Sequence, residues 1–366
     1  MPLQIGIIGL PNVGKSTLFN VLTQAQDAEV ANYPFCTIEP NQAIVPVPDH
    51  RLDKLAEIVG VKKVIKTTIE FLDIAGLVKG ASQGEGLGNK FLGTIRNTDA
   101  LLHVVRCFED SNVVHISEHP DPREDIEIVQ VELILADLEQ ITKKLEKLSR
   151  QVKGDKNLTS ELKMAELVLA HLQSGELLSI FEERNHPDFI HLNQELNFLS
   201  AKPVIYAANI AEENLSSKHI AVEEINEIAK KEGAEVVQIS ALIESELNLL
   251  EDNEKSDYMT LSGIQASGLE QVIQTGYQTL NLISFFTYNE LEARAWTVQN
   301  GAKAPEAAGQ IHTDFQRGFI KAEVIPFSVF AEYGSTSAAK DAGKLQIEGK
   351  DYIVLDGDVI FFRFNV

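Results

Sequence analysis

The chain contains 366 residues, of which 44% are hydrophobic and 23% are charged, and its formal net charge at pH 7 is −22. Two or three globular domains can form at this length, and a chain this acidic can contact nucleic acid only through a local basic patch. The two distant cysteines give no disulfide framework, the N-terminus has no signal-peptide pattern, and no apolar run is long enough to span a bilayer. We therefore expect a cytoplasmic protein without membrane contact.

A predicted strand at residues 3–9 leads into Gly-Leu-Pro-Asn-Val-Gly-Lys-Ser at 9–16, and a helix-like stretch follows. These eight residues fill the phosphate-loop pattern GxxxxGK[ST] in the strand–loop–helix setting that the pattern requires. Backbone N–H groups of such a loop surround a phosphate chain at the N-terminus of a helix. Lys15 is then expected to reach the β- and γ-phosphates, and Ser16 to bind Mg²⁺. The pattern predicts a site for a nucleoside triphosphate.

Two later segments add to the predicted phosphate site. The run Ile-Glu-Phe-Leu-Asp at 69–73 ends a predicted strand, and Gly76 completes the motif DxxG. Asp73 is placed to hold Mg²⁺ through water, and the Gly76 N–H to bond the γ-phosphate. The glycine-rich segment 77–88 has the low rearrangement cost that a switch needs. Thr37, in the loop after the first helix, is placed to complete the Mg²⁺ shell, although a loop threonine alone is a weak signal.

Strand-like runs at 3–9, 67–74, 100–108, 202–209 and 235–240 predict a parallel α/β sheet. Between about 123 and 200 the pattern changes to long helices. Their apolar residues follow spacings of three and four, which forms a heptad seam: Val131, Ile134, Leu138, Ile141, Leu145, Leu148 and Val152, then Leu158, Leu162, Ala165, Leu169 and Leu172. We interpret the segment as an inserted antiparallel helical hairpin or coiled coil. Two ordinary helices packed on the sheet are the alternative.

Basic residues gather toward the turn of this hairpin, at Lys143, Lys144, Lys147, Arg150, Lys153 and Lys156. In a chain of net negative charge this is a local reversal of sign. It indicates a tip that binds RNA phosphates, whereas an ordinary solvated helix face is the alternative.

The predicted strand 202–209 ends in Asn209-Ile210-Ala211-Glu212, where a guanine site normally has NKxD. Ile210 replaces the lysine that lies along the base, and Glu212 replaces the aspartate that pairs with guanine. Losing such a paired contact changes discrimination strongly, so we expect little preference for guanine. Adenine could use Asn209 and main-chain groups near Ile210. Ser240, after the strand 235–240, opens a segment that resembles the next base-contacting loop.

Hydrolysis needs a residue that orients water, yet Leu77 stands where Ras-like sites have glutamine after DxxG. We therefore expect slow turnover. Asn12 in the phosphate loop could help to coordinate a monovalent cation, which predicts stimulation by K⁺. His115 is a further catalytic candidate, although a lone histidine is more often a surface or core residue.

After about residue 280, strand-like pieces at 282–288, 294–298, 318–325 and 352–364 predict a small mixed domain. A turn at 356–358 separates two of them.

Together, GLPNVGKST at 9–17, NYPFCTIEPN at 32–41, FLDIAGLVKGASQGEGLGN at 71–89 and the NxxE motif at 209–212 resemble the YchF family, the Obg-like ATPases among the P-loop GTPases of the translation-factor class. HTDFQRGFIKAEVI at 312–325 and DGDVIFFRFNV at 356–366 resemble the closing segments of a TGS domain, a ubiquitin-like β-grasp module. The resemblance implies an α/β Ras-like G domain at 1–122 and 201–280, a helical insertion at 123–200 and a TGS domain at 281–366.

The resemblance also implies an ATP-preferring hydrolase that accepts GTP as a second substrate, with roles in translation or the stress response. The residues that it places on the phosphates are Asn12, Val13, Gly14, Lys15, Ser16 and Thr17. It places Ser16 and Thr37 on Mg²⁺ and brings Ile210 to the base through its backbone. The implied partners are RNA and the ribosome, with the large subunit expected.

Three functions stay open on the sequence: a slow ATPase that acts as a switch on the ribosome, an ordinary GTPase, and an RNA-binding module that uses nucleotide only as a conformational ligand. A metabolic kinase fits poorly because no acceptor-substrate site is evident.

Overall fold

The computed structural model describes residues 3–29, 41–74, 87–109, 120–212, 219–250, 252–261 and 267–365. Thr37, Gly76, Leu77 and His115 lie outside these residues, as does most of the glycine-rich segment. The chain divides into two compact units, one of residues 1–27, 37–44 and 70–276 and the other of residues 28–36, 45–69 and 277–366.

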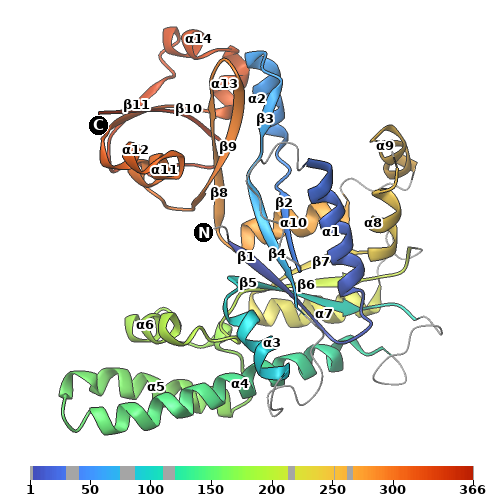
Figure 1. The fold of residues 1–366 in the computed structure, drawn as a ribbon, viewed down its shortest axis with the longest axis vertical. Helices are drawn as coiled ribbons and strands as arrows, with labels where there is room; N and C mark the ends of the chain where they lie inside the picture. The colour runs from blue at the N-terminus through green and yellow to red at the C-terminus, as the bar shows by residue number, and fades with distance from the viewer. Residues whose placement is uncertain are drawn as a thin grey trace. The chain divides into compact units, whose positions relative to one another are not determined.

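The first unit is built on a six-stranded sheet in the order β2-β4-β1-β5-β6-β7 (Figure 1). Its strands are β1 (Gln4–Ile8), β2 (Gln42–Pro46), β4 (Thr68–Asp73), β5 (Ala100–Arg106), β6 (Val204–Asn209) and β7 (Glu235–Ile239). The chain β4-β1-β5-β6-β7 is parallel throughout. β5 is buried at every residue, which is typical of a central parallel strand. The five predicted strands and the α/β class are confirmed, whereas β2 was not predicted.

Helices of this unit include α1 (Lys15–Glu29), α3 (Leu87–Arg96), α7 (Ile220–Glu232), α8 (Ala241–Leu247), α9 (Asp252–Leu261) and α10 (Gly268–Thr279). Helices α1, α3 and α7 each lie between two strands of this sheet, whereas α8, α9 and α10 follow its last strand, β7. A buried apolar cluster joins α7 to β5 and β6 through Val222, Ile225, Val105 and Tyr206. This packing fixes the strand ends that carry the predicted site.

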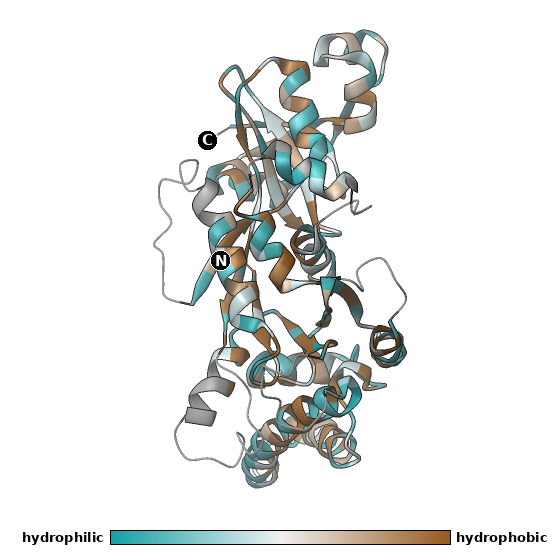
Figure 2. Cartoon of the chain, turned by 90° about the vertical axis from the view of Figure 1, so that its right-hand side faces the viewer, coloured by the Kyte–Doolittle hydropathy of each residue, from teal (hydrophilic) through white to brown (hydrophobic). Residues whose placement is uncertain are grey.

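The predicted helical insertion is present. It consists of α4 (Pro122–Gln151), α5 (Thr159–Gln173) and α6 (Pro187–Leu196), with α4 and α5 side by side and joined at one end (Figure 1). Asp121 caps α4 by accepting from the N–H groups of Arg123 and Glu124, and Pro122 follows at the first helical position. In Figure 2 the insertion lies at the bottom of the view, with hydrophilic residues over much of its outer side.

The seam between α4 and α5 follows the predicted positions only in part. Ile134, Ile141 and Leu148 are buried against α5, but Val131 is 51% exposed and lies outside the seam. The prediction for Val131 is wrong because the first half of α4 packs on the sheet, through Ile126, before the helix reaches α5. The third helix, α6, also covers the seam with Phe189 and Leu192, so the insertion is more than a bare hairpin.

The second unit contains a mixed six-stranded sheet in the order β11-β10-β12-β8-β9-β3. Its strands are β3 (Lys63–Ile65), β8 (Leu282–Tyr288), β9 (Glu292–Gln299), β10 (Phe319–Pro326), β11 (Gln346–Glu348) and β12 (Asp358–Phe364). Its helices are α2 (His50–Val59), α11 (Ala304–Ile311), α12 (Thr313–Arg317), α13 (Phe327–Tyr333) and α14 (Thr336–Asp341). One apolar cluster packs α11 on the sheet, and a second packs α2 and α13. All four predicted strand regions contain strands, but the last strand starts at 358, after the turn at Gly357.

Residues 45–69 belong to this second unit, although the predicted boundaries place them with the nucleotide domain. Here β3 pairs in parallel with β9, and Leu52 and Leu55 of α2 are fully buried in the second unit's core. Arg51 donates to Asp49 and to Asp356, which joins α2 to the turn before β12. The three-part division of the chain stays a prediction, with this additional strand and helix to be included in the C-terminal part.

Candidate nucleotide-binding site

The predicted phosphate loop connects β1 to α1 in a conformation that needs its particular residues. Gly9, Asn12 and Gly14 all have positive φ, and asparagine is among the side chains that tolerate this region. A Cβ atom on Gly14 would lie 2.4 Å from Asn209 Nδ2, so a larger residue would push the loop away from β6. Val13 is buried beneath the loop. The positive φ angles and the close approach to Asn209 therefore explain why Gly9, Asn12 and Gly14 stand at these positions.

Lys15, at the start of α1, is only 7% exposed, and its ammonium group donates to Leu10 O at 2.6 Å. Burial lowers the pKa of Lys15 to about 8, and the nearby Asp73 carboxylate acts in the opposite direction. Burial raises the pKa of Asp73, against the effect of Lys15. The loop thus holds a desolvated cation that a phosphate chain would stabilise far better than one carbonyl oxygen does.

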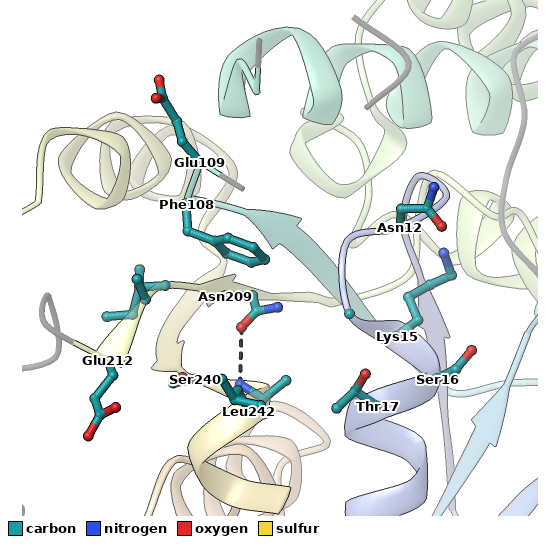
Figure 3. Close-up of a pocket in the computed structure, with 14 residues that line it drawn as sticks. Asn12, Lys15, Ser16, Thr17, Phe108, Glu109, Asn209, Glu212, Ser240 and Leu242 are labelled. Carbon is teal, nitrogen blue, oxygen red and sulfur yellow. Dashed lines mark hydrogen bonds between the residues drawn. The ribbon is translucent and has the colours of Figure 1, made fainter. Parts of the chain in front are cut away.

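A pocket of about 790 Å³ opens beside the loop, which is within the range of small-molecule sites. It lies at the carboxyl ends of the parallel strands, where ligands of such sheets bind. Its lining includes Asn12, Gly14, Lys15, Ser16 and Thr17, together with Asn209, Ile210, Glu212 and Ser240 (Figure 3). The structure therefore brings nine of the predicted nucleotide residues to one cavity. Val13 is the exception, since its side chain is buried below the loop.

The pocket also contains residues that the sequence reasoning did not select: Phe108, Glu109, Ala211, Ala241 and Leu242. Figure 3 shows the Phe108 ring turned toward Asn209. Buried Arg106 holds this residue by donating from Nε to Phe108 O at 3.1 Å, with its guanidinium over the ring. The position of Phe108 after a predicted parallel strand was a usable signal, because that edge forms the site in such sheets.

Asn209 connects three parts of the site. Its Nδ2 donates to Val13 O at 2.9 Å, and its Oδ1 accepts from the Ala241 N–H at 3.1 Å (Figure 3). The side chain is only 4% exposed. These bonds fasten the phosphate loop and the start of α8 to the end of β6. One N–H and one oxygen lone pair of the amide are used in these bonds, so Asn209 supports both loops, and its contact with the base stays a prediction.

Ile210, which stands where the guanine motif has lysine, is buried in an apolar cluster. Its side chain is 1% exposed and packs in the cluster with Val105 and Ile225, and its N–H donates to Ile239 O at 2.8 Å. The backbone carbonyl is the group of this residue that could meet a base. A carbonyl accepts, so it matches the amino group of adenine and not the carbonyl oxygen of guanine.

Glu212 lines the pocket, and its Oε1 accepts from the Tyr258 hydroxyl at 2.9 Å. Ser240 is buried and precedes α8, whose first residue Ala241 gives its N–H to Asn209. The NxxE segment and the loop after β7 thus meet at the end of the pocket away from Lys15.

Ser16 and Asp73 are the described members of the predicted magnesium set. Mg²⁺ is commonly held by one or two protein oxygens together with phosphate oxygens and water, and a hydroxyl and a carboxylate suit it. The charge interaction between Asp73 and Lys15 shows that the carboxylate lies near the phosphate loop. Within the described part of the chain, no group of three or more His, Cys, Asp or Glu residues could bind a metal by itself.

The basic cluster of the insertion is smaller than its sequence indicates. The ammonium group of Lys144 lies 2.8 Å from Glu161 and 2.5 Å from Glu195, with its side chain only 10% exposed, so it joins α4 to α5 and α6. Lys143 pairs with Glu139. The exposed remainder, which we call the basic tip, is Lys147, Arg150, Lys153 and Lys156.

Among the described residues, no helix combines the length and apolar character of a membrane span.

Two known protein families match separate parts of the chain. The family described as "50S ribosome-binding GTPase" matches residues 4–154, and the YchF GTPase C-terminal family, described as "Protein of unknown function (DUF933)", matches residues 282–365. The match at 4–154 and the phosphate loop identify a P-loop GTPase-type domain, as predicted.

Curated relatives extend the match from end to end. Proteins named "Ribosome-binding ATPase YchF" from Haemophilus ducreyi and Bacillus subtilis are 51% and 49% identical to this chain, and each match covers all of this chain and all of the relative. The solved structure of the Schizosaccharomyces pombe YchF GTPase is 36% identical and superposes with a TM-score of 0.89, over 99% of this chain and 97% of that one. With such identity over its full length, the chain belongs to the YchF family.

Proposed function

We propose that this protein binds and slowly hydrolyses ATP in the pocket beside the phosphate loop, and that the nucleotide controls its association with the ribosome. The observation that carries the base preference is the hydrogen bonding at the far end of the pocket. The N–H groups of Ile210 and Ala241 are both used inside the protein, by Ile239 O and by Asn209 Oδ1. The acceptors at this end include the Ile210 carbonyl and the Glu212 carboxylate, and they suit the amino group of adenine.

The phosphate chain would lie along Asn12–Thr17, with Lys15 exchanging Leu10 O for phosphate oxygens. Because phosphate is negative, its binding favours the charged form of Lys15 that burial now disfavours. Ser16, Thr37 and Asp73 would hold Mg²⁺, which when bound would supply positive charge to offset the negative charge that develops during transfer of the phosphoryl group.

For hydrolysis we propose that the Gly76 N–H bonds the γ-phosphate and that water is oriented without a glutamine, since residue 77 is leucine. His115 and a K⁺ ion near Asn12 are the two candidate aids. Turnover should be higher in potassium than in sodium buffer, and His115→Ala should reduce it. Equal rates in both buffers contradict the potassium role, and unchanged turnover in the variant dismisses the histidine.

The ribosomal role rests on the relatives, which are named ribosome-binding ATPases. We propose that the basic tip contacts ribosomal RNA, with the large subunit as the partner, because it concentrates positive charge on an acidic chain. By contrast, several basic residues of the second unit are neutralised locally: Lys303 by Asp351, Arg317 by Asp314 and Lys321 by Glu323. Acidic substitution of the basic tip should therefore weaken co-sedimentation with ribosomes, whereas alanine at Lys303 should not.

The decisive experiment is a titration of the purified protein with ATP and with GTP, with and without ribosomes, that follows both affinity and phosphate release. We expect tighter ATP binding and slow phosphate release. Much tighter binding of GTP, or binding of neither nucleotide, refutes the proposal.

An ordinary GTPase is the second candidate, because the solved relative from Schizosaccharomyces pombe is named a GTPase. Restoring the guanine motif with Ile210→Lys and Glu212→Asp tests it. We expect the double variant to move preference toward GTP, and a chain that already prefers GTP would gain little.

A further inference from the structure

Tyr258 and Glu212 are 46 residues apart in sequence but meet at the base end of the pocket. The tyrosine lies on α9, and its hydroxyl donates to Glu212 Oε1 at 2.9 Å. Glu212 is the last residue of the NxxE segment and lines the cavity. Figure 3 shows its carboxylate directed away from the phosphate-loop side chains. A partner outside the nucleotide motifs thus holds the residue that would read the base.

We propose that Tyr258 is a positioning residue for nucleotide specificity, which holds the Glu212 carboxylate in an orientation that disfavours guanine. This inference rests on the proposed function, since it assigns the base preference of the same site. Tyr258 belongs to none of the nucleotide motifs and lies on α9, which follows β7 in the chain.

The chemistry of the two bases explains the direction of the effect. Guanine presents two neighbouring donors, its ring N–H and its exocyclic amine, and pairing with both requires two carboxylate oxygens turned to the same side. Adenine presents one exocyclic amine beside a ring nitrogen that accepts. A carboxylate anchored through Oε1 can still give Oε2 to a single donor, but it loses orientational freedom for the paired contact. Anchoring therefore costs guanine more than adenine.

The extra methylene of glutamate makes this restraint necessary. A glutamate has one more rotatable bond than aspartate, so without a partner it could swing into the two-oxygen arrangement. Two other donors at this end are already bonded within the protein, the Ala241 N–H to Asn209 and the Ile210 N–H to Ile239. The tyrosine is the described contact that fixes Glu212.

The test is a double-mutant cycle on the full-length chain, with dissociation constants for ATP and GTP measured by equilibrium titration. Tyr258→Phe removes only the hydroxyl and should tighten GTP relative to ATP by about threefold, because this hydrogen bond to a carboxylate is exposed to solvent. In a Glu212→Ala background, which has no acceptor for the hydroxyl, the same substitution should leave the ATP/GTP ratio unchanged. Glu212→Asp, which withdraws the carboxylate from the hydroxyl, should also shift preference toward GTP.

Tyr352→Phe is the matched control, because it removes a tyrosine hydroxyl that donates to Asp358 at 2.7 Å in the second unit. It should not alter the ratio. The inference is overturned if Tyr258→Phe changes both affinities equally, or if its effect on the ratio persists without the carboxylate. A wild-type chain that binds neither nucleotide would instead refute the proposed function, and would show this before any variant is compared.

Discussion

Replacing Asn209 with alanine separates support of the phosphate loop from recognition of the base. The variant removes the donor to Val13 O at 2.9 Å and the acceptor of the Ala241 N–H at 3.1 Å, both buried. Each hydrogen bond contributes about 1 kcal/mol net, and a buried group left without a partner costs about 1–3 kcal/mol. We therefore expect the nucleotide-free protein to lose about 2–4 kcal/mol of stability.

The assay has two parts, because the two roles differ in what they affect. Denaturant unfolding without nucleotide should show a lower midpoint for Asn209→Ala. Titration with ATP, GTP and inorganic tripolyphosphate should show similar losses for all three, since the displaced loop binds the phosphates that they share. Asn248→Ala is a matched control, as it removes one amide donor to Val21 O on α1, outside the pocket lining.

One result would refute this account of Asn209. If the nucleotide-free variant unfolds at the wild-type midpoint, binds tripolyphosphate normally and loses affinity only for nucleotides, then the side chain reads the base. Asn209→Asp gives an independent check, because it keeps the acceptor for Ala241 but puts a carboxylate against Val13 O. It should be at least as destabilising as alanine.

Three further predictions follow from buried charge and from the composition of the second unit. The pKa of Lys15 is lowered to about 8 in the folded protein, so above that pH the unfolded chain binds more protons than the folded chain. The free energy of unfolding of the wild-type protein, compared with that of Lys15→Met, should therefore rise from pH 8 to the normal lysine pKa of about 10.5. Parallel stability–pH curves for the two proteins would contradict this. Lys144→Ala should cost about 1–3 kcal/mol in denaturant unfolding because it leaves two carboxylates without their partner, whereas Lys147→Ala should cost under about 0.5 kcal/mol. A fragment of residues 277–366 should give the dispersed NMR spectrum of a folded domain only when residues 45–69 are supplied. Within 45–69, α2 fills part of the fragment's core and β3 pairs with β9 at the edge of its sheet.

The sequence predicted the elements whose signals are local. The parallel strands were found because they are short apolar runs bounded by turns, and the phosphate loop because its function demands fixed spacings. α2 had usable signals that were missed: Asp49 caps its start and Gly60, in the left-handed region, ends it. Its place in the second unit could not be predicted, because the pairing of β3 with β9 joins residues more than 200 positions apart.

In the candidate site, too, the local signals were predicted and the contacts between distant residues were not. Motif spacing predicted which residues gather at the pocket, but not what their side chains do there. Asn209 was interpreted as a base contact, and its bonds to Val13 and Ala241 appear only when three segments are brought together. The sequence analysis grouped Lys144 with the basic residues expected to bind RNA, because its charge is visible in the sequence, whereas its partner Glu195 is 51 residues away. Local patterns identify candidates, and nonlocal contacts decide which groups are available for a ligand.

α4 gives a physical link between the nucleotide domain and the basic tip. Its first half is buried with β5 and α7 through Ile126, and its second half carries the insertion, over a helix of 30 residues. At the junction, fully buried Asp137 accepts from the N–H groups of Leu199 and Ser200, which fastens the returning chain to α4. A continuous helix clamped at its middle turns as one body, and 30 residues span about 45 Å. One continuous helix therefore joins the packing around β5 to the basic tip, and the proposed control of ribosome contact by nucleotide would have to act along it.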